Sequence, residues 1–171
     1  MNIIQLKSNE YHLYYQPYFE ILGEVDLVEE LYSRQDYLFD LLKNIPADKF
    51  KYAYEDGKWT IAELLLHIID TERIFQYRAL RFSRNDSTDL SGFEQDQYVA
   101  NSNAFLRSKK DLIEEFKSVR NSSITLFSAM TDEALLRRGK ASGNIISVRA
   151  LGFLISGHQR HHEQILLERY L

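Results

Sequence analysis

The segment SRNDSTDLSGFEQDQYVANSN, residues 83–103, decides how we expect the chain to fold. It is polar and rich in turn-forming residues, and it separates two long stretches in which apolar residues recur with helical spacing. A connection of about twenty residues without secondary structure is uncommon inside a compact domain unless it is functional or required by the topology. We therefore interpret it as a crossover that carries the chain back along the molecule, so that the helices before and after it run parallel.

The predicted helix before the crossover runs from Thr60 to Phe82. It opens with the sequence TIAE, in which Thr60 and Glu63 have the spacing of a capping box. Trp59 and Leu64 are placed to form a hydrophobic staple around this cap. Isoleucines, leucines and aromatic residues then recur every three or four positions, which is the pattern of a helix that faces a core.

Three other stretches have the same periodicity. They run from about Val25 to Lys43 before Pro46, from Asn103 or Ser108 to about Met130, and from Ser147, a natural N-cap, almost to Leu171. Short links join the first helix to the second and the third to the fourth. Four long amphipathic helices with one long connection predict an all-α four-helix bundle in up-down-down-up order, with the crossover between helices 2 and 3.

Two segments lie outside these helices. Residues 11–23 are aromatic and interrupted by Pro17, so we interpret them as a packed arm with about one turn of helix. Residues 131–144 are polar, and we predict a linker there. At 171 residues the chain is expected to form a single domain, 1–171.

The composition is that of a globular protein, because 44% of the residues are apolar and 27% are charged. No apolar run approaches the roughly 20 residues of a membrane helix, and no signal-peptide pattern is present, so we expect a cytoplasmic protein with no membrane partner. The net charge of −4, with scattered Lys and Arg, argues against a nucleic-acid partner. The absence of cysteine excludes disulfides and thiolate metal sites, so any metal must have nitrogen and oxygen ligands.

Three of the five histidines lie within five positions of the last predicted helix. At 100° per residue, His158 and His162 fall in the middle of its apolar face, whereas His161 falls at the edge. A spacing of four residues places two imidazoles one above the other, as in helices that bind one metal with two nitrogens. The same pair is also compatible with hydrogen-bonded core histidines or with favourable interactions near a helix C-terminus.

A third ligand is expected from the second predicted helix, where His67 lies beside a polar notch. The notch is formed by Glu63, Asp70, Thr71 and Arg78. In the predicted topology this helix is antiparallel to the last one, with His67 about 10 Å from its start and the histidine pair about 15 Å from the opposing end. The levels match, so the sequence predicts a mononuclear three-histidine site. Gly152 and Gly157 indicate close packing near it.

Other patterns are missing or have simpler interpretations. No histidine follows a glutamate by three positions, as ferritin-like di-metal bundles require, and the metalloprotease motif HExxH is absent. We expect His12 and His161 to lie at the surface or beside the ligands. Glu63 is interpreted as a helix cap, and Asp70 and Glu72 are expected to be solvated.

The segments KWTIAELLLHIIDTE, residues 58–72, and GHQRHHEQILLERYL, residues 157–171, together resemble the DinB-like, YfiT-like superfamily of small metal-binding four-helix proteins. Trp59 and the three histidines His67, His158 and His162 stand where that family has its metal site. The resemblance implies the up-down-down-up order, a homodimer and a divalent ion such as zinc or nickel.

The resemblance also implies an activity. Relatives include proposed metal-dependent hydrolases, and transferases or isomerases that use a low-molecular-weight thiol such as bacillithiol or mycothiol. Residues 92–103 resemble the crossover of that family, which would bring Glu94 and Asp96 over the mouth of the site.

The leading hypothesis is an enzyme for a small-molecule substrate: a metal-dependent hydrolase, or an S-transferase with a low-molecular-weight thiol as cosubstrate. Both reactions need a metal with an open position, which acidifies a water or binds a thiol. Glu94, Asp96 and His161 are candidates for a general base, and none of them is assigned as catalytic. The alternative is a noncatalytic, metal-stabilised dimeric interaction or stress-response module, in which the metal would be closed off from solvent.

Overall fold

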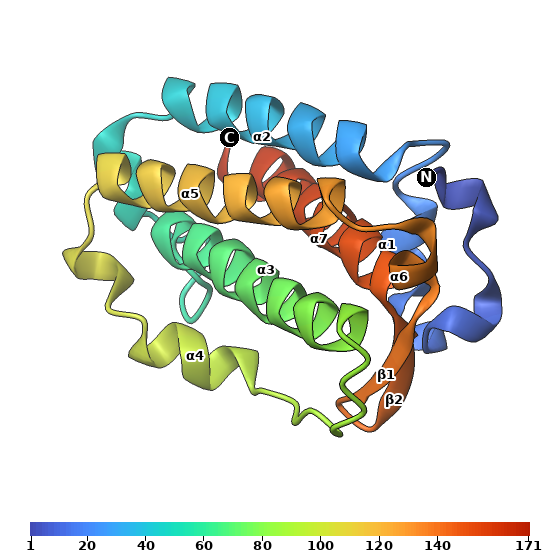
Figure 1. The fold of residues 1–171 in the computed structure, drawn as a ribbon. Coiled ribbons are helices and arrows are strands. Elements are labelled where there is room, and N and C mark those ends of the chain that lie inside the picture. Colours follow the sequence, from blue (N-terminus) through green and yellow to red (C-terminus); the bar gives the residue numbers. More distant parts are fainter.

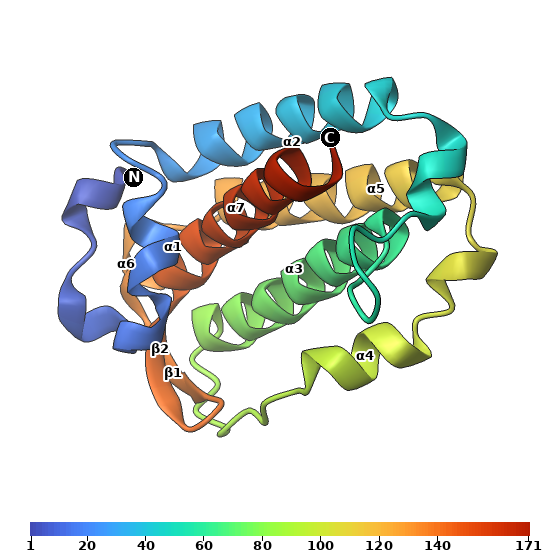
Figure 2. The same ribbon diagram turned by 180° about the vertical axis from the view of Figure 1, so that it is seen from behind.

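Four long helices form the body of the molecule in the computed structural model, which describes residues 1–171 (Figure 1). They are α2 (Leu27–Asn44), α3 (Ile61–Ser83), α5 (Lys109–Ser128) and α7 (Val148–Ile165), the last of which continues into a π-helical turn, Leu166–Tyr170. Figures 1 and 2 show that α2 and α7 run in one direction and that α3 and α5 run in the other. The predicted all-α bundle with up-down-down-up order is confirmed. No helix in it is long and apolar enough to cross a bilayer.

Side-chain caps fix where three of these helices begin. Thr60 Oγ1 accepts a hydrogen bond from the N–H of Glu63, and the Glu63 carboxylate accepts one from the N–H of Thr60 at 2.7 Å, as the capping box predicts. Ser147 caps α7, and Ser108 forms a second capping box with Asp111 at the start of α5. Of the two predicted starts for the third helix, Ser108 is therefore the one adopted.

The crossover between α3 and α5 is partly helical, which the sequence did not predict. It contains the short helix α4 (Gln95–Asn101) and a 3-10 turn, Ala104–Leu106, and it passes beside α3 (Figure 1). Within α4 only Val99 is buried, so the helix has no apolar periodicity for a sequence pattern to reveal. Upstream, Leu90 exchanges backbone hydrogen bonds with Lys140 and Ser142, which fixes this part of the crossover to residues 138–147.

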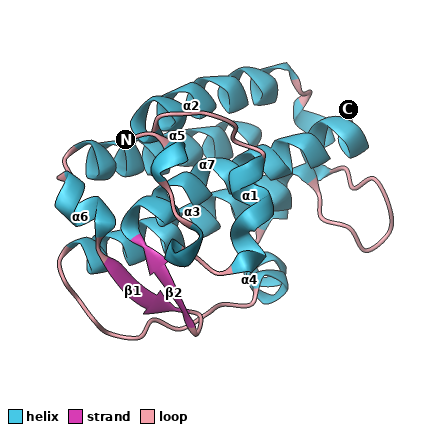
Figure 3. Cartoon of the chain, turned by 90° about the vertical axis from the view of Figure 1, so that its right-hand side faces the viewer, coloured by secondary structure: helices cyan, strands magenta, loops and turns pink.

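The predicted linker at residues 131–144 is also structured. It holds the helix α6 (Asp132–Leu136) and the strand β1 (Arg138–Ala141), which pairs with β2 (Asn144–Ser147) in an antiparallel hairpin (Figure 3). The turn residues Ser142 and Gly143 both have positive φ, 50° and 78°, as a two-residue type I′ turn requires. The segment links α5 to α7 as predicted, and the elements inside it are too short for a sequence pattern to reveal.

The N-terminal arm has the predicted single helical stretch, α1 (Gln16–Glu20), preceded by three 3-10 turns. The arm packs against α7. A Cβ at position 157 would overlap with the carbonyl oxygen of Tyr18, so Gly157 allows the backbone of α1 to approach α7 closely. Gly152 similarly lies against the side chains of Leu27 and Phe127. Both glycines therefore have the packing role expected of them.

Two apolar clusters fill opposite ends of the bundle. One combines the start of α2 and α7 with the ends of α3 and α5, and the other combines the remaining halves. Between them lies a layer of buried polar side chains, which we call the polar layer: Glu30, His67, Thr71, Glu72, Arg120, Ser123, Ser156, His158, Gln159, His162 and Glu163. Burying this many polar groups is unfavourable unless they pair with one another or bind a ligand. The polar layer is therefore the candidate location of a functional site.

Candidate metal centre

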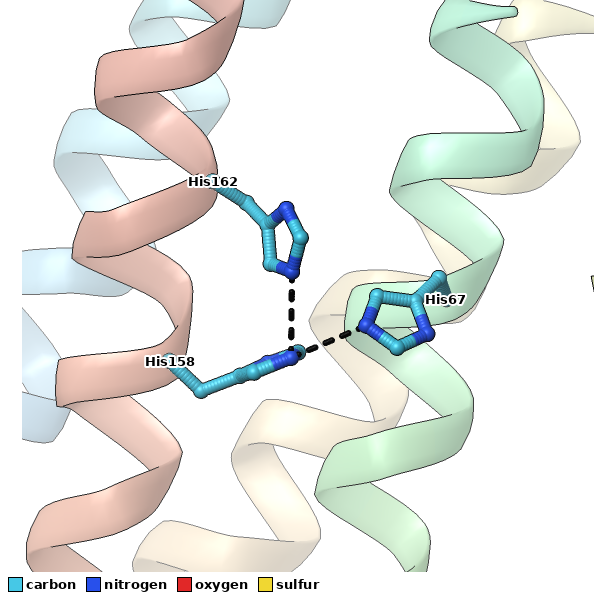
Figure 4. A group of neighbouring side chains, drawn as sticks. All are labelled: His67, His158 and His162. Atoms are coloured by element: carbon cyan, nitrogen blue, oxygen red, sulfur yellow. Dashed lines mark hydrogen bonds between the residues drawn. The ribbon is translucent and has the colours of Figure 1, made fainter. Parts of the chain in front are cut away.

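Three imidazole rings meet between α3 and α7 (Figure 4). His67 Nε2 lies 2.9 Å from His158 Nε2, and His162 Nε2 lies 3.1 Å from the same atom. One ligand nitrogen from each ring lies within 4.8 Å of the other two. The residues His67, His158 and His162 are 4%, 8% and 8% exposed. The structure thus brings together the three histidines that the sequence analysis selected.

Hydrogen bonds between the three imidazoles cannot all be well formed in this arrangement. The single in-plane position on His158 Nε2, whether a lone pair or an N–H, faces two other nitrogens at once. One proton at this point serves one of the two contacts well and leaves the other weak. Zn–N bonds of about 2.0–2.1 Å in tetrahedral geometry place ligand nitrogens roughly 3.3 Å apart, so small ring rotations would fit a divalent ion between the three rings.

Burial keeps the three imidazoles neutral. Desolvation lowers the pKa of His67 to about 4, although the charge of Asp96 opposes this shift. Desolvation, together with the neighbouring rings, lowers the pKa values of His158 and His162 well below 6.5. Neutral imidazoles have a free lone pair near pH 7, which is the form that binds a metal.

Packing with aromatic rings orients the imidazoles. The Trp59 ring lies 4.8 Å from the His67 ring, and the Tyr18 and Phe75 rings lie 5.9 and 6.2 Å from the His158 ring, centroid to centroid. His162 Nδ1 is buried and has no hydrogen-bond partner, so this ring lacks the oxygen acceptor that usually orients a metal-bound histidine.

The three rings border two cavities, and Asp96 lines both of them. The first, which we call the main cavity, has a volume of about 310 Å³ and reaches His67 and His158. Its walls combine aromatic side chains with charged and polar ones: Tyr14, Tyr15, Tyr18, Thr71, Phe75, Arg78, Phe93, Glu94, Gln95, Asp96, Ser142 and Leu154. A second cavity of about 280 Å³ reaches His162 beside Trp59 and Tyr170. The site therefore has open sides.

Comparison with known proteins places this arrangement in a family. Residues 30–166 match the model of the DinB superfamily. The chain belongs to the DinB superfamily. No curated protein matches the sequence.

Two solved structures share this fold. YfiT from Bacillus subtilis, a probable metal-dependent hydrolase with an unusual four-helix bundle topology, superimposes with a TM-score of 0.74 at 14% identity, over 83% of this chain and 82% of YfiT. A DinB-like protein, YjoA from Bacillus subtilis, gives a TM-score of 0.59 at 21% identity, over 82% of this chain and 86% of that one. At these identities the likeness concerns the fold.

Both predicted acidic residues of the crossover line the main cavity of this DinB-superfamily protein. Asp96 also lines the second cavity, and its negative charge raises the pKa of His67, so it is the carboxylate that acts most directly on the site. Glu94 borders only the main cavity.

The remaining histidines are outside the cluster. His161 is half-buried, with its ring 5.4 Å from Tyr18, and burial lowers its pKa. His12 is exposed, and its Nδ1 accepts a hydrogen bond from the N–H of Tyr14.

The prediction that Glu72 is solvated was wrong. Glu72 is 2% exposed, and Arg120 donates hydrogen bonds of 2.8 and 2.9 Å to its two carboxylate oxygens. Arg120 also donates to Gln159 Oε1, and Gln159 Nε2 donates to Glu163 Oε1 at 2.6 Å. A sequence signal existed, because Arg120 falls four residues after Phe116 on the apolar stripe of its helix. Asp70 is half-buried and lies near Arg73.

Glu72, Arg120, Gln159 and Glu163 form a hydrogen-bonded network. It belongs to the same polar layer as the histidines but lies on a different side of α7. Gln159 and Glu163 each follow a histidine by one residue, so they point about 100° away around α7. There Gln159 accepts a hydrogen bond from Arg120 of α5 and donates one to the carbonyl oxygen of Arg34 on α2, and the Glu163 carboxylate pairs with the Arg34 guanidinium at 3.4 Å. The network thus fixes the rotation of α7 and, with it, the direction in which His158 and His162 point.

Proposed function

We propose that the chain is a metal-dependent hydrolase of small molecules and that His67, His158 and His162 bind its divalent ion, zinc or nickel. The observation that carries this proposal is the convergence of three buried, neutral imidazoles beside an open cavity. Three protein ligands with an open fourth position are typical of catalytic zinc sites. The fold likeness to YfiT, a probable metal-dependent hydrolase, supports the same reaction class.

When bound, a divalent ion supplies Lewis-acid catalysis: it polarises a carbonyl or phosphoryl oxygen and lowers the pKa of a water to about 7. The residues of the chain supply the rest. Asp96, at the border of both cavities, is placed to accept the proton of the attacking water as a general base. Tyr18 and Phe75 form an apolar wall beside His158 that excludes bulk water from the reacting groups.

A low-molecular-weight thiol is the alternative nucleophile, and it would make the chain an S-transferase. We favour water because Asp96 lies beside the site. A base helps an attacking water, whose pKa on a metal is about 7, more than it helps a thiol, which a metal binds as the thiolate.

The noncatalytic alternative requires a closed metal. The histidine cluster has no fourth His, Asp or Glu donor among its members, and it borders a cavity of about 310 Å³. Both observations favour an enzyme over a metal-stabilised interaction module.

Elemental analysis of protein purified without an affinity tag tests the metal site. We expect about one divalent ion per chain in the wild type and in the His12→Ala control, which removes an exposed histidine outside the cluster. His67→Ala and His162→Ala should lose most of the metal. Equal metal content in all four proteins would refute the site.

Activity on nitrophenyl carboxylate and phosphate esters, with and without added thiols, tests the reaction. We expect hydrolysis that needs no thiol, that stops when a chelator removes the metal and that returns when the metal is restored. Turnover only in the presence of a thiol would replace the hydrolase with the transferase.

A further inference from the structure

Three arginine side chains are almost completely buried, and one of them has no counterion. Arg78, Arg120 and Arg149 are 3%, 0% and 4% exposed. Arg120 donates to both carboxylate oxygens of Glu72, and Arg149 donates to both carboxylate oxygens of Glu10. Arg78 forms no ion pair.

The hydrogen-bond partners of Arg78 are neutral. Its Nη2 donates to the carbonyl oxygen of Ser91 at 3.0 Å and to the hydroxyl of Ser142 at 2.9 Å. Burial lowers the pKa of Arg78, and the phenol of Tyr15 offsets only part of this effect. A buried guanidinium without an opposite charge is unfavourable, so Arg78 is a candidate for binding an anionic ligand, whereas Arg120 and Arg149 already have their counterions.

Arg78 lies on the side of α3 that lines the main cavity. His67, Thr71, Phe75 and Arg78 are spaced four, four and three residues apart, so they form one stripe, and all four line the main cavity. Eleven residues separate the first from the last, about 16 Å along the helix axis. Hydrogen bonds to Ser91 and Ser142 hold the Arg78 guanidinium at the end of this stripe that is far from His67.

The charges in the main cavity are therefore arranged in a defined order. Asp96, which also borders the second cavity beside His162, lies on the side of the histidines, and Arg78 lies at the other end against the hairpin turn at Ser142. Glu94 and Asp96 are exposed, and neither pairs with Arg78. The positive charge of Arg78 thus remains available to a ligand.

We propose that the main cavity binds a small substrate with an anionic oxygen group, a carboxylate or a phosphate, and that Arg78 holds this group. The inference rests on the proposed function only for what happens at the histidine end. The fork of N–H donors in a guanidinium matches two oxygens of a carboxylate or phosphate. Thr71 Oγ1 is buried without a hydrogen-bond partner and adds an unused polar group to the same wall.

The cavity also limits the size and the body of the substrate. Its volume of about 310 Å³ is at the lower end of ligand-binding sites, so it suits a metabolite and not a polymer. The wall between Arg78 and the histidines contains Tyr15, Tyr18 and Phe75, which suit an aromatic or aliphatic body. The substrate class is therefore a small organic acid or phosphomonoester with an apolar body.

The test measures ligand binding to protein freed of metal by a chelator, so that its outcome does not depend on the metal. The probes are phenylacetate, the neutral phenylacetamide and phenyl phosphate, titrated by calorimetry. We expect one or both anions to bind the wild type about ten- to a hundredfold more tightly than the amide, the range given by charge-assisted hydrogen bonds. The anion that binds more tightly shows whether the cavity prefers a carboxylate or a phosphate.

Variants assign the preference to Arg78. Arg78→Gln should abolish it by weakening anion binding ten- to a hundredfold while leaving amide binding unchanged. Arg78→Lys keeps the positive charge but lacks the forked donors of a guanidinium, so it should retain part of the preference for the anions. The matched control is Arg138→Gln, an exposed arginine on β1 that does not line the cavity, and it should bind all probes like the wild type.

A second measurement covers the case in which Arg78→Gln fails to fold. Phenylacetate or phenyl phosphate should then shift the Arg78 Nε–H resonance of the wild type in the NMR spectrum, and phenylacetamide should not. The proposal is overturned if neither anion binds at millimolar concentrations, if the amide binds as tightly as the anions, or if Arg78→Gln retains the preference. Anion binding without metal binding would refute the metal centre alone, and the reverse result would refute this inference alone.

Discussion

Gly157 of α7 lies directly against the carbonyl oxygen of Tyr18 in α1, at a distance that leaves no room for a Cβ. The contact holds the N-terminal arm against the last helix one residue before His158. It also places the Tyr18 ring 5.9 Å from the His158 ring. The arm is thus part of the site wall and not only an N-terminal extension of the bundle.

Gly157→Ala is expected to push α1 away from α7 and to destabilise the protein by about 1–3 kcal/mol through overpacking against rigid backbone. Urea denaturation measures the change. Ser156→Ala is the matched control in the same helix, because it removes a buried hydroxyl that has no hydrogen-bond partner and should be neutral or slightly stabilising. Similar losses for both variants would show that the Gly157 contact is not special.

Mutations of the buried pair Glu72–Arg120 should have non-additive effects on the free energy of unfolding. Glu72→Gln and Arg120→Met should each destabilise the fold by about 3–5 kcal/mol, since each leaves a buried partner without its counterpart. The double variant should cost less than the sum of the two, and a double-mutant cycle measures the difference. Glu114→Gln, which breaks the exposed pair with Lys110, should leave the unfolding midpoint unchanged. Additive effects in the buried pair would argue against the network.

The Glu10–Arg149 pair predicts a pH dependence. Burial alone would raise the pKa of Glu10, but hydrogen bonds from Arg149 and from the N–H of Lys7 hold it below the ordinary value of 4.5. A carboxyl whose folded pKa is depressed contributes stability above its unfolded pKa, and this contribution is lost as the pH falls through the folded value.

Thermal unfolding of the wild type and of Glu10→Gln measures this contribution. The wild type should unfold at a higher temperature at pH 7, and its advantage should shrink once the pH falls below 4.5. An advantage that is constant from pH 7 to pH 3 would contradict the assignment.

Metal binding at the three histidines should stabilise the fold. At a free zinc or nickel concentration a hundred times the dissociation constant, the gain is about 2.7 kcal/mol. Differential scanning calorimetry should therefore show a lower melting temperature after chelator treatment of the wild type. His162→Ala should not respond to the chelator, whereas His12→Ala should respond like the wild type.

Asp96→Asn should lower the rate of ester hydrolysis about 10²- to 10⁴-fold without loss of metal, because it removes a general base and leaves the histidines intact. Glu94→Gln, the matched change at the neighbouring acidic position of the main cavity, should have a smaller effect. If the two variants lose equal activity, Asp96 is not the base.

The sequence predicted those features that depend on neighbours along the chain. The capping box at Thr60 and the N-cap at Ser147 follow from residues within one turn of helix. The inward direction of His158 and His162 follows from the period of the helix, and helix rise placed His67 at the same level.

What the sequence did not predict depends on contacts between distant segments. Helix α4 and the hairpin are stabilised by tertiary contacts and have too few residues for periodicity. The burial of Glu72 requires Arg120, which lies 48 residues away. The homodimer and the thiol cosubstrate stay predictions, which sedimentation analysis and thiol titration would test.

The main cavity divides its residues between two kinds of structure. The histidines and Arg78 project from long helices whose packing keeps them in place, whereas Glu94, Asp96 and Ser142 belong to the crossover and the hairpin turn. Insertions or substitutions in those two connections would change the shape of the main cavity without moving the three imidazoles. Changes confined to these two connections would therefore alter which ligands fit, while the positions of the three histidines stay the same.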